Sequence, residues 1–451
     1  MNMRNLIVFL IVPVLSQITS AKIYGNIDYF GYYYLEIWVG TPSVRQTVIL
    51  DTGSSLTAFP CIGCVSCGQH IDSYYDYTKS STYRPIPCAS NITCSACNNN
   101  RCEYYQAYAE GSSISGILVQ DSISITVSDD PVASIFGCHL RETSLFKSQI
   151  VDGIMGLSYK NNEIGSIIDN LFDSKRLQSN SFSLCLGQID GILTIGGFNE
   201  SLHLEPTKWI KLFDHEFYSV KISTFKIDDK DVLIESDDFS KMYKTGTIFD
   251  SGTTFLYLTG NIYLKVIQGF KEFCKVEENC KARTIRVFGE PQRCYIYDLK
   301  TRFNEFLRSF PDIVAVFDDF VEYRWKPEEY LFAWPETPNY YCTGIYNNFE
   351  GGNVLGGIFM RGKDVVFNRS DDLIGFSSSE CGDYGTSNRT RSILPYIAAG
   401  DGVKKYSVGL VIFFSCGLMG LVSCLYMLNR KKQQEDPQDS KIIKDIEDIP
   451  I

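Results

Sequence analysis

Short apolar runs separated by turn-forming residues recur along most of the chain. Val, Ile, Tyr, Phe and Thr runs are interrupted by Gly, Asn, Asp or Pro, as in 32–39, 116–127 and 191–195. This pattern is typical of β-strands. Helical patterns are few, and the better candidates are 163–177, 261–273 and 299–310. The sequence therefore predicts a mainly β protein with a few covering helices.

The two ends of the chain carry apolar segments of another kind. Residues 1–21 combine Arg4, an apolar run and small residues before Lys22, which predicts a secretory signal peptide. Residues 407–428 contain no charge and would form about 33 Å of helix, enough to span a bilayer. A basic cluster follows at 430–432, which predicts a single-pass type I membrane protein with a lumenal catalytic region. A buried helix is the alternative for 407–428.

An internal repeat organises the region between these ends. The segment VILDTGSSL at 48–56 recurs as TIFDSGTTF at 247–255, so that an apolar strand twice runs into Asp, a hydroxyl residue and Gly. A second motif, IMGL at 154–157, returns as VLGG at 354–357 at nearly the same offset. Two motifs that share one offset predict two homologous β lobes.

The expected domain limits follow from these patterns. In chain order they are the signal peptide 1–21, an N-terminal lobe 22–184 with a Cys-rich insertion at 61–102 and a flap, a C-terminal lobe 185–381, a stalk 382–406, the membrane helix 407–428 and a cytosolic tail 429–451.

Composition narrows the class of function. The chain has 53 acidic and 42 basic residues, a net charge of −11 and a pI near 5.0, which disfavours nucleic-acid binding and favours a basic substrate. None of the four histidines has HExxH spacing, which excludes a zincin. Sixteen cysteines favour an oxidising compartment.

The repeated loops carry the candidate chemistry. Asp51 and Asp250 each follow an apolar strand and precede a glycine, Gly53 or Gly252, which permits a tight turn or a close approach. One such loop would be an ordinary turn, but two copies on a pseudo-dyad can bring both carboxylates together. Such a pair shares one proton, so the ionised member can activate water while the protonated member polarises a peptide carbonyl. The chemistry needs no metal, cofactor or covalent nucleophile.

These motifs, with YYLEIWVGTP at 33–42, resemble those of the pepsin-like aspartic peptidases over roughly residues 30 to 380. The resemblance implies a bilobal β fold in which Asp51 and Asp250 form the catalytic pair. It also implies that the hydroxyls of Ser54 and Thr253 support this pair and that Tyr108 is the flap tyrosine. The family has a tryptophan seven residues after the first Asp, and Ala58 stands there in this chain. The usual hydrogen-bond partner of the flap tyrosine is therefore in doubt.

A closer resemblance is to plasmepsin V and its apicomplexan relatives. It is carried by DTGSSLTAFPC at 51–61, the Cys-rich stretch after it, YAEGSS at 108–113 and WKPEEYL at 325–331. It implies cleavage of secretory proteins after Leu in Arg-x-Leu export motifs, in the endoplasmic reticulum or Golgi, with Glu110 binding the Arg. An acidic side chain also suits a basic substrate on charge alone. The alternative for Glu110 is a solvated charge at the flap tip.

Fourteen cysteines lie outside the expected membrane span, eight before residue 140 and six after it. Even numbers in both groups predict seven disulfides of unknown connectivity. A zinc or iron–sulfur site is the alternative for the CxxCxxC run, which also resembles the insertion of nepenthesin-type plant peptidases. The disulfide candidates are Cys61, Cys64, Cys67, Cys88, Cys94, Cys97, Cys102, Cys138, Cys185, Cys274, Cys280, Cys294, Cys342 and Cys381.

Four sequons fit the lumenal location, and they predict N-glycosylation at Asn91, Asn199, Asn368 and Asn388. We expect poor glycan access at Asn368, which is placed in a strand turn. About eleven residues separate Lys22 from a first strand expected at Tyr33, which leaves no room for a longer inhibitory prosegment. We therefore expect activity without prosegment removal.

Three functions are compatible with these features. The first is a membrane-anchored aspartic endopeptidase that processes secretory proteins. A β-secretase-like sheddase with broader apolar specificity is the second, and a non-catalytic binding module on the same fold is the third. Both aspartates, both loop glycines and the flap tyrosine are present, which favours an enzyme.

Overall fold

The computed structural model describes residues 19–382 except 160–163, 215, 233–245, 277–278, 281–282, 286–293, 301, 335–338 and 349–350. Most of the expected signal peptide, the stalk after residue 382, the segment 407–428 with its tail, and Asn388 lie outside the described residues. Among those that are described, no helix is long and apolar enough to cross a membrane.

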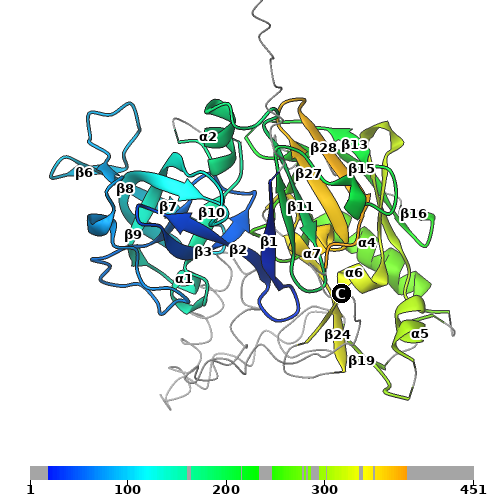
Figure 1. The fold of residues 1–451 in the computed structure, drawn as a ribbon. Coiled ribbons are helices and arrows are strands. Elements are labelled where there is room, and N and C mark those ends of the chain that lie inside the picture. The colour runs from blue at the N-terminus through cyan, green and yellow to red at the C-terminus, as the bar shows by residue number, and fades with distance from the viewer. Residues whose placement is uncertain are drawn as a thin grey trace, which may run out of the picture.

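One large sheet extends through the whole molecule (Figure 1), with its strands in the order β13-β28-β27-β11-β12-β1-β2-β3-β10-β4-β9-β8-β7-β6 and β5 beside β8. Their bounds are β1 Thr19–Asn26, β2 Tyr32–Val39, β3 Val44–Asp51, β4 Ala58–Pro60, β5 Arg84–Pro85, β6 Ala96–Asn98, β7 Arg101–Ala107, β8 Ser113–Ser124, β9 Val132–Glu142, β10 Gly153–Gly156, β11 Ser181–Leu186, β12 Gly191–Ile195, β13 Lys208–Lys211, β27 Lys363–Asn368 and β28 Leu373–Ser378.

Three smaller sheets lie within residues 219–355. The first has the order β14 Ser219–Val220, β17 Thr247–Phe249, β26 Asn353–Leu355, β18 Leu256–Thr259 and β25 Ile345–Asn348. The second has the order β16 Lys230–Val232, β15 Ile222–Ile227, β21 Ile313–Phe317 and β22 Glu322–Trp325. The third has the order β19 Arg283–Ile285, β20 Cys294–Ile296, β24 Tyr340–Thr343 and β23 Leu331–Ala333. We call residues 32–156 the N-terminal lobe and residues 219–355 the C-terminal lobe. In Figure 1, β1, β11 and β27 lie between these lobes.

The internal repeat predicted from the sequence has a structural basis. In the N-terminal lobe β3 pairs in parallel with β10, which places Gly156 beside Asp51. In the C-terminal lobe β17 pairs in parallel with β26, which places Leu355 beside Phe249, the residue before Asp250. The two repeated motifs are therefore neighbours in each lobe, which explains why they share one offset.

Helices are short and cover the sheets, as the sequence predicted. The three expected helices correspond to α2, α4 and α5, and α4 turns four apolar residues, Ile262, Val266, Ile267 and Phe270, into the core. The helices and 3₁₀ turns are α1 Leu145–Ser148, α2 Ile167–Asp173, α4 Gly260–Phe273, α5 Phe303–Arg308, α6 Pro327–Tyr330, α7 Gly357–Met360, η1 Tyr77–Lys79, η2 Glu200–Leu202 and η3 Asp318–Phe320.

The expectation that the first strand begins at Tyr33 is wrong. Residues Thr19–Asn26 form β1, which pairs with β12 on one side and β2 on the other. Ile23 is fully buried because it faces the core of the joined sheet. The alternation of this segment is short and adjoins the apolar leader, so tertiary pairing rather than local pattern defines the strand. The expected lobe boundary at 184/185 falls inside β11.

All fourteen candidate cysteines form disulfides, and each bridge stays within its expected group. The alternative of a metal-binding CxxCxxC run is not supported, because Cys61, Cys64 and Cys67 are each bonded to sulfur. The bridges are Cys61–Cys138, Cys64–Cys67, Cys88–Cys97, Cys94–Cys102, Cys185–Cys381, Cys274–Cys280 and Cys294–Cys342.

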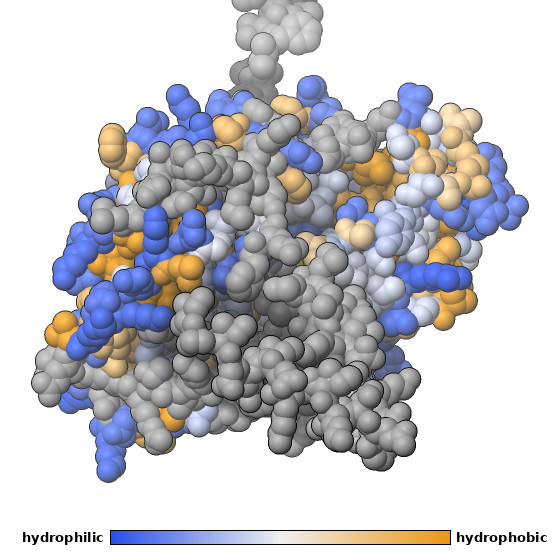
Figure 2. All heavy atoms as spheres, turned by 180° about the vertical axis from the view of Figure 1, so that it is seen from behind, coloured by the Kyte–Doolittle hydropathy of each residue, from blue (hydrophilic) through white to orange (hydrophobic). Residues whose placement is uncertain are grey.

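The face of the molecule in Figure 2 is mostly hydrophilic where the described residues are coloured, with apolar side chains in scattered spots. Of the three sequons within the described part of the chain, Asn91 is exposed and Asn199 accepts a hydrogen bond from the Ser201 hydroxyl at 2.7 Å. Asn368 is half-buried, and its amide donates to Asp371 at 2.8 Å. Poor glycan access at Asn368 stays a prediction.

Candidate active site

The loop after β3 holds Asp51 through both carboxylate oxygens. The Gly53 N–H donates to Asp51 Oδ1 at 2.9 Å, and the Ser54 hydroxyl donates to Oδ2. Asp51 is 4% exposed, so these two donors replace most of the water that its carboxylate would otherwise bind. The expected supporting role of Ser54 has the geometry that it requires.

The loop after β17 repeats this arrangement around Asp250. The Gly252 N–H donates to Asp250 Oδ1 at 2.9 Å, and the Thr253 hydroxyl donates to Oδ2 at 2.5 Å. The two loops therefore use the same atoms in the same roles, although their sequences differ at the hydroxyl positions.

The two aspartates face each other across the junction of the lobes. A Cβ atom built on Gly53 would overlap the Asp250 carboxylate, and one built on Gly252 would overlap the Asp51 carboxylate. Each loop thus needs glycine because the other lobe's carboxylate lies against its backbone. This is the close approach that the sequence predicted for a carboxylate pair.

Two hydroxyl residues that the sequence analysis did not single out lock the loops together. Thr52 N–H donates to Ser251 Oγ at 3.0 Å, and Ser251 N–H donates to Thr52 Oγ1 at 2.9 Å. Each hydroxyl also donates to a backbone carbonyl of the opposite lobe, Thr52 to Phe249 at 3.0 Å and Ser251 to Leu50 at 2.8 Å. The signal was present in the sequence as a hydroxyl residue directly after each repeated Asp.

The electrostatics of the pair favour a proton on Asp51. Burial raises the pKa of Asp51 well above its ordinary value, and the negative charge of Asp250 raises it further. Asp250 is only partly buried, and water can therefore reach it more readily. Two like charges in contact cannot both be ionised cheaply, so the pair holds one proton in common.

The hairpin of β7 and β8 carries the expected flap residues at its tip. Tyr108 N–H donates to Ser112 O at 2.9 Å, and the turn passes through Gly111 with φ of +89°. The Tyr108 ring packs against Phe146 with 5.0 Å between ring centroids. Its hydroxyl is buried and lies beside Ser54, and Ala58 stands where the family has a tryptophan. Burial, then the charge of Asp51, raises the pKa of Tyr108.

Glu110 lies at the same flap tip, where its carboxylate accepts a hydrogen bond from the Ser112 hydroxyl. Burial raises the pKa of Glu110, and the negative charge of Asp250 adds to this rise. Glu110 is half-buried, so the alternative of a solvated charge at the flap tip stays open, and its role toward substrate stays a prediction.

A buried arginine that the sequence analysis missed supports the Asp51 loop from the other side. Arg369 donates to the Asp169 carboxylate at 2.7 Å and to the Leu157 and Ser158 carbonyls. The Leu157 N–H in turn donates to Asp51 O at 2.7 Å. Nothing local in the sequence marks this arginine, because its partners are about 200 residues away.

The sequence of this chain is similar to a known protein family and to several of its members. The family model of eukaryotic aspartyl proteases matches residues 32–379. Aspartic protease 5 of Toxoplasma gondii is 28% identical over 449 residues, covering 87% of this chain and 40% of that protein. Plasmepsin V of Plasmodium falciparum is 27% identical over 463 residues, covering 84% of this chain and 76% of that protein.

A plant protein shows how widely the similarity extends. Aspartic proteinase 36 of Arabidopsis thaliana is 27% identical over 384 residues, covering 78% of this chain and 75% of that protein. This chain thus spans less than half the length of the Toxoplasma protein and about three quarters of the other two.

Proposed function

This chain belongs to the eukaryotic aspartyl protease family as an aspartic-type endopeptidase, and we propose that it is membrane-anchored and cleaves secretory-pathway proteins after Leu in Arg-x-Leu motifs. The observation that carries the peptidase assignment is the mutual contact of the Asp51 and Asp250 loops through Gly53 and Gly252. A non-catalytic binding module would not require two hydrogen-bonded carboxylates to share one proton.

The pair can hydrolyse a peptide bond with these side chains alone. Asp51, whose pKa is raised, donates a hydrogen bond to the carbonyl oxygen of the substrate. Asp250 accepts a proton from a water molecule, and the oxygen of that water attacks the carbonyl carbon while the proton of Asp51 moves to the carbonyl oxygen, which gives a neutral tetrahedral diol. As the C–N bond breaks, Asp250 gives its proton to the leaving nitrogen and one diol hydroxyl returns a proton to Asp51. Ser54, Thr253 and the two glycine N–H groups keep both carboxylates in place throughout.

The proposed Arg specificity rests on Glu110. Its partly buried carboxylate lies on the flap within reach of the charge of Asp250, so an arginine bound beneath the flap could neutralise it. A charge-assisted, bidentate contact of this kind discriminates Arg from Lys as well as from neutral residues. The acidic net charge of the chain favours the same class of substrate.

The membrane location is proposed from the sequence of the two ends. A leader at 1–21, an uncharged segment at 407–428 and a basic cluster at 430–432 support a type I protein of the endoplasmic reticulum or Golgi with a lumenal active site. Full-length protein should stay with membranes after alkaline carbonate extraction, whereas a chain that stops at residue 406 should be released. Release of the full-length protein would remove the anchor from the proposal.

Cleavage of a peptide pool tests the enzymatic part. Purified full-length protein and Asp51→Asn are incubated at pH 5 to 7 with Arg-x-Leu peptides and with Lys-x-Leu and Ala-x-Leu controls, and products are read by mass spectrometry. We expect cuts after Leu that need the Arg and vanish in the variant. Dyad-dependent cuts without an Arg requirement would leave a general endopeptidase, such as a sheddase. No cleavage by the wild type would contradict the peptidase assignment.

A further inference from the structure

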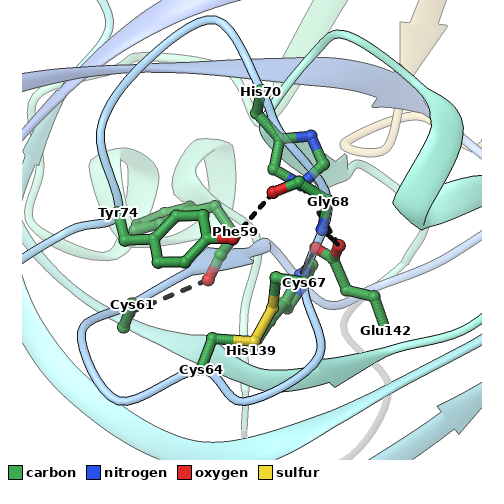
Figure 3. Close-up of a disulfide and its surroundings, with 9 residues drawn as sticks. All are labelled: Phe59, Cys61, Cys64, Cys67, Gly68, His70, Tyr74, His139 and Glu142. Carbon is green, nitrogen blue, oxygen red and sulfur yellow. Dashed lines mark hydrogen bonds and ion pairs between the residues drawn. A yellow bond between two sulfur atoms is a disulfide. The ribbon is translucent and has the colours of Figure 1, made fainter.

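A buried histidine–carboxylate–histidine cluster joins the Cys-rich insertion to the flap strands (Figure 3). Glu142, the last residue of β9, has Oε2 at 3.1 Å from His70 Nε2 and accepts the Gly68 N–H at 3.0 Å. Its Oε1 lies 2.8 Å from His139 Nδ1. None of the three side chains has exposed surface. A buried carboxylate with this many partners is costly to build unless it holds something in place.

Hydrogen-bond chemistry fixes where the protons lie in this cluster. His70 Nδ1 is 3.1 Å from the Gln149 carbonyl, which can only accept, so Nδ1 carries a hydrogen. A neutral His70 would then direct the lone pair of Nε2 at the Glu142 carboxylate. The 3.1 Å contact therefore requires His70 to be an imidazolium. His139 donates through Nδ1, while its buried Nε2 has no partner in the part of the chain that the structure describes, so His139 is neutral.

The pKa directions agree with this assignment. Burial opposes a charge on His70, but its hydrogen bond to Glu142 and the charge of that residue outweigh burial and raise the pKa of His70. Burial likewise opposes the charge on Glu142, yet the two histidines hold the pKa of Glu142 at about 2. Burial lowers the pKa of His139. A raised histidine pKa means that the contact is complete below about pH 6.5 and is lost as pH rises through the raised value.

The cluster is connected to the flap by backbone and by rings. Glu142 N–H donates to Ser66 O of the insertion at 3.2 Å, and Glu142 lies opposite Ile114 of β8, two residues beyond Ser112. The next residue, Thr143, exchanges hydrogen bonds with Ser113 at the start of β8. On the side-chain route, the His139 ring meets Phe146 edge-on at 6.0 Å, and Phe146 packs against Tyr108 at 5.0 Å.

We propose that Glu142 is a positioning residue for the flap: its ion pair with His70 ties the Cys-rich insertion to β8 and β9, and its contact with His139 sets the place of Phe146 and hence of Tyr108. The inference rests on the proposed function, in which Tyr108 lies over the substrate. The insertion then contributes to substrate binding without touching substrate, and it does so most strongly at acidic pH.

Other charged and titratable groups lie on the elements that pack around the cluster. The insertion contributes Tyr74 and Asp72, β7 contributes Tyr104, β9 contributes Arg141, α1 contributes Lys147, and the turn before β10 contributes Asp152. Burial raises the pKa of Asp72 to about 6, although Arg45 opposes the rise. Asp152 also favours the charged form of His70.

Three variants of the full-length protein test the proposal. Glu142→Gln removes the charge, and we expect KM for an Arg-x-Leu peptide to rise about tenfold with kcat changed less than about twofold. We also expect the alkaline limb of kcat/KM to move to lower pH. His70→Gln keeps a donor at the position of Nε2 but cannot titrate, so its alkaline limb should move to higher pH with KM near the wild-type value. Asp364→Asn is the matched control, because Asp364 is a buried carboxylate 2.8 Å from His203 Nε2 in the joint between the lobes.

Hydrogen exchange of the flap amides at 104–118 gives a readout that does not depend on catalysis. We expect faster exchange in Glu142→Gln, and in the wild type above the pKa of His70, but not in Asp364→Asn. A Glu142→Gln protein with wild-type pH profile, KM and flap exchange would overturn the proposal, even if it were less stable. If the wild type cleaves nothing while Glu142→Gln still frees the flap, the peptidase function fails and the coupling stands.

Discussion

The two lobes hold the same loop in different surroundings. Asp51 and Asp250 each accept from a glycine N–H at 2.9 Å and from a hydroxyl three residues along. Asp51 is buried beneath the flap of its own lobe, whereas Asp250 is only partly buried. Because the bonds are alike, the difference in surroundings makes the two carboxylates unequal. That inequality lets one hold a proton while the other activates water.

The same comparison extends beyond the loops. The N-terminal lobe adds a flap, a Cys-rich insertion with four of the seven disulfides, and the cluster of His70, His139 and Glu142. The C-terminal lobe adds short sheets and the longest helix described, α4. The loop that occurs in both lobes therefore supplies the catalytic chemistry. The flap, the insertion and the cluster, which belong to the N-terminal lobe, supply the proposed substrate specificity and its dependence on pH.

Removing either carboxylate gives the largest expected effect. Asp51→Asn and Asp250→Asn should each lower kcat/KM by about 10²- to 10⁴-fold, because each removes one partner of the acid–base pair. Their stabilities should differ. The raised pKa of Asp51 means that its stabilising contribution is lost as pH rises, so Asp51→Asn should unfold at higher urea concentration than the wild type at pH 7. Equal activity in either variant would contradict the carboxylate mechanism.

The disulfide between Cys185 in β11 and Cys381 should contribute more to stability than the Cys64–Cys67 disulfide of the insertion. Cys185–Cys381 closes a loop with a sequence separation of 196, and Cys64–Cys67 one of 3. A chain-entropy argument gives about 5 kcal/mol for the first bridge and about 2 kcal/mol for the second. Paired Cys→Ala variants compared by urea unfolding measure both. Similar losses from the two pairs would show that native-state contacts, not loop closure, set the contribution.

The ion pair beneath the Asp51 loop should matter more than an exposed one. Asp169→Asn leaves Arg369 buried without its counter-ion, and we expect a loss of about 3 kcal/mol in the free energy of unfolding. Asp229→Asn breaks the exposed pair with Arg324 in the C-terminal lobe and should cost less than about 1 kcal/mol. Comparable losses by chemical denaturation would mean that burial does not make the Asp169–Arg369 pair more important to stability than an exposed pair.

A smaller effect than the loss of the buried ion pair is expected from the hydroxyls that connect the two loops. Thr52→Val leaves the buried Ser251 N–H without an acceptor and should cost about 1 to 3 kcal/mol. Thr194→Val is the control, since Thr194 is equally buried and its hydroxyl has no partner among the described residues. If both variants lose the same stability, the cross-lobe bonds contribute nothing beyond packing.

Features that rest on a repeated motif or on a residue count could be predicted from the sequence without a structure. The Asp-hydroxyl-Gly pattern at 51–53 and 250–252 identified both loops, and even cysteine numbers on each side of residue 140 predicted seven bridges. Repetition and counting are informative because they do not depend on knowing which distant residues meet. Thr52 and Ser251 belonged to this class of signal, but their roles became clear only once the loops were known to face each other.

Features that depend on a distant partner could not be predicted. The strand Thr19–Asn26 exists because β12 pairs with it, and His70 meets Glu142 across 72 residues of sequence. The connectivity of the bridges and the contacts of Arg369 are of the same kind. Local pattern contains no information on such contacts, because burial and pairing arise only when the lobes fold together.

The most direct test of the central claim compares matched peptides on the full-length enzyme. The ratio of kcat/KM for an Arg-x-Leu peptide to that for its Ala-x-Leu counterpart is measured for the wild type, Asp51→Asn and Glu110→Gln. We predict that Asp51→Asn loses both activities, whereas Glu110→Gln keeps cleavage of the Ala peptide and loses most of the preference for Arg. If Glu110→Gln lowers both activities equally, or Asp51→Asn retains either one, the division between shared chemistry and N-terminal specificity is wrong.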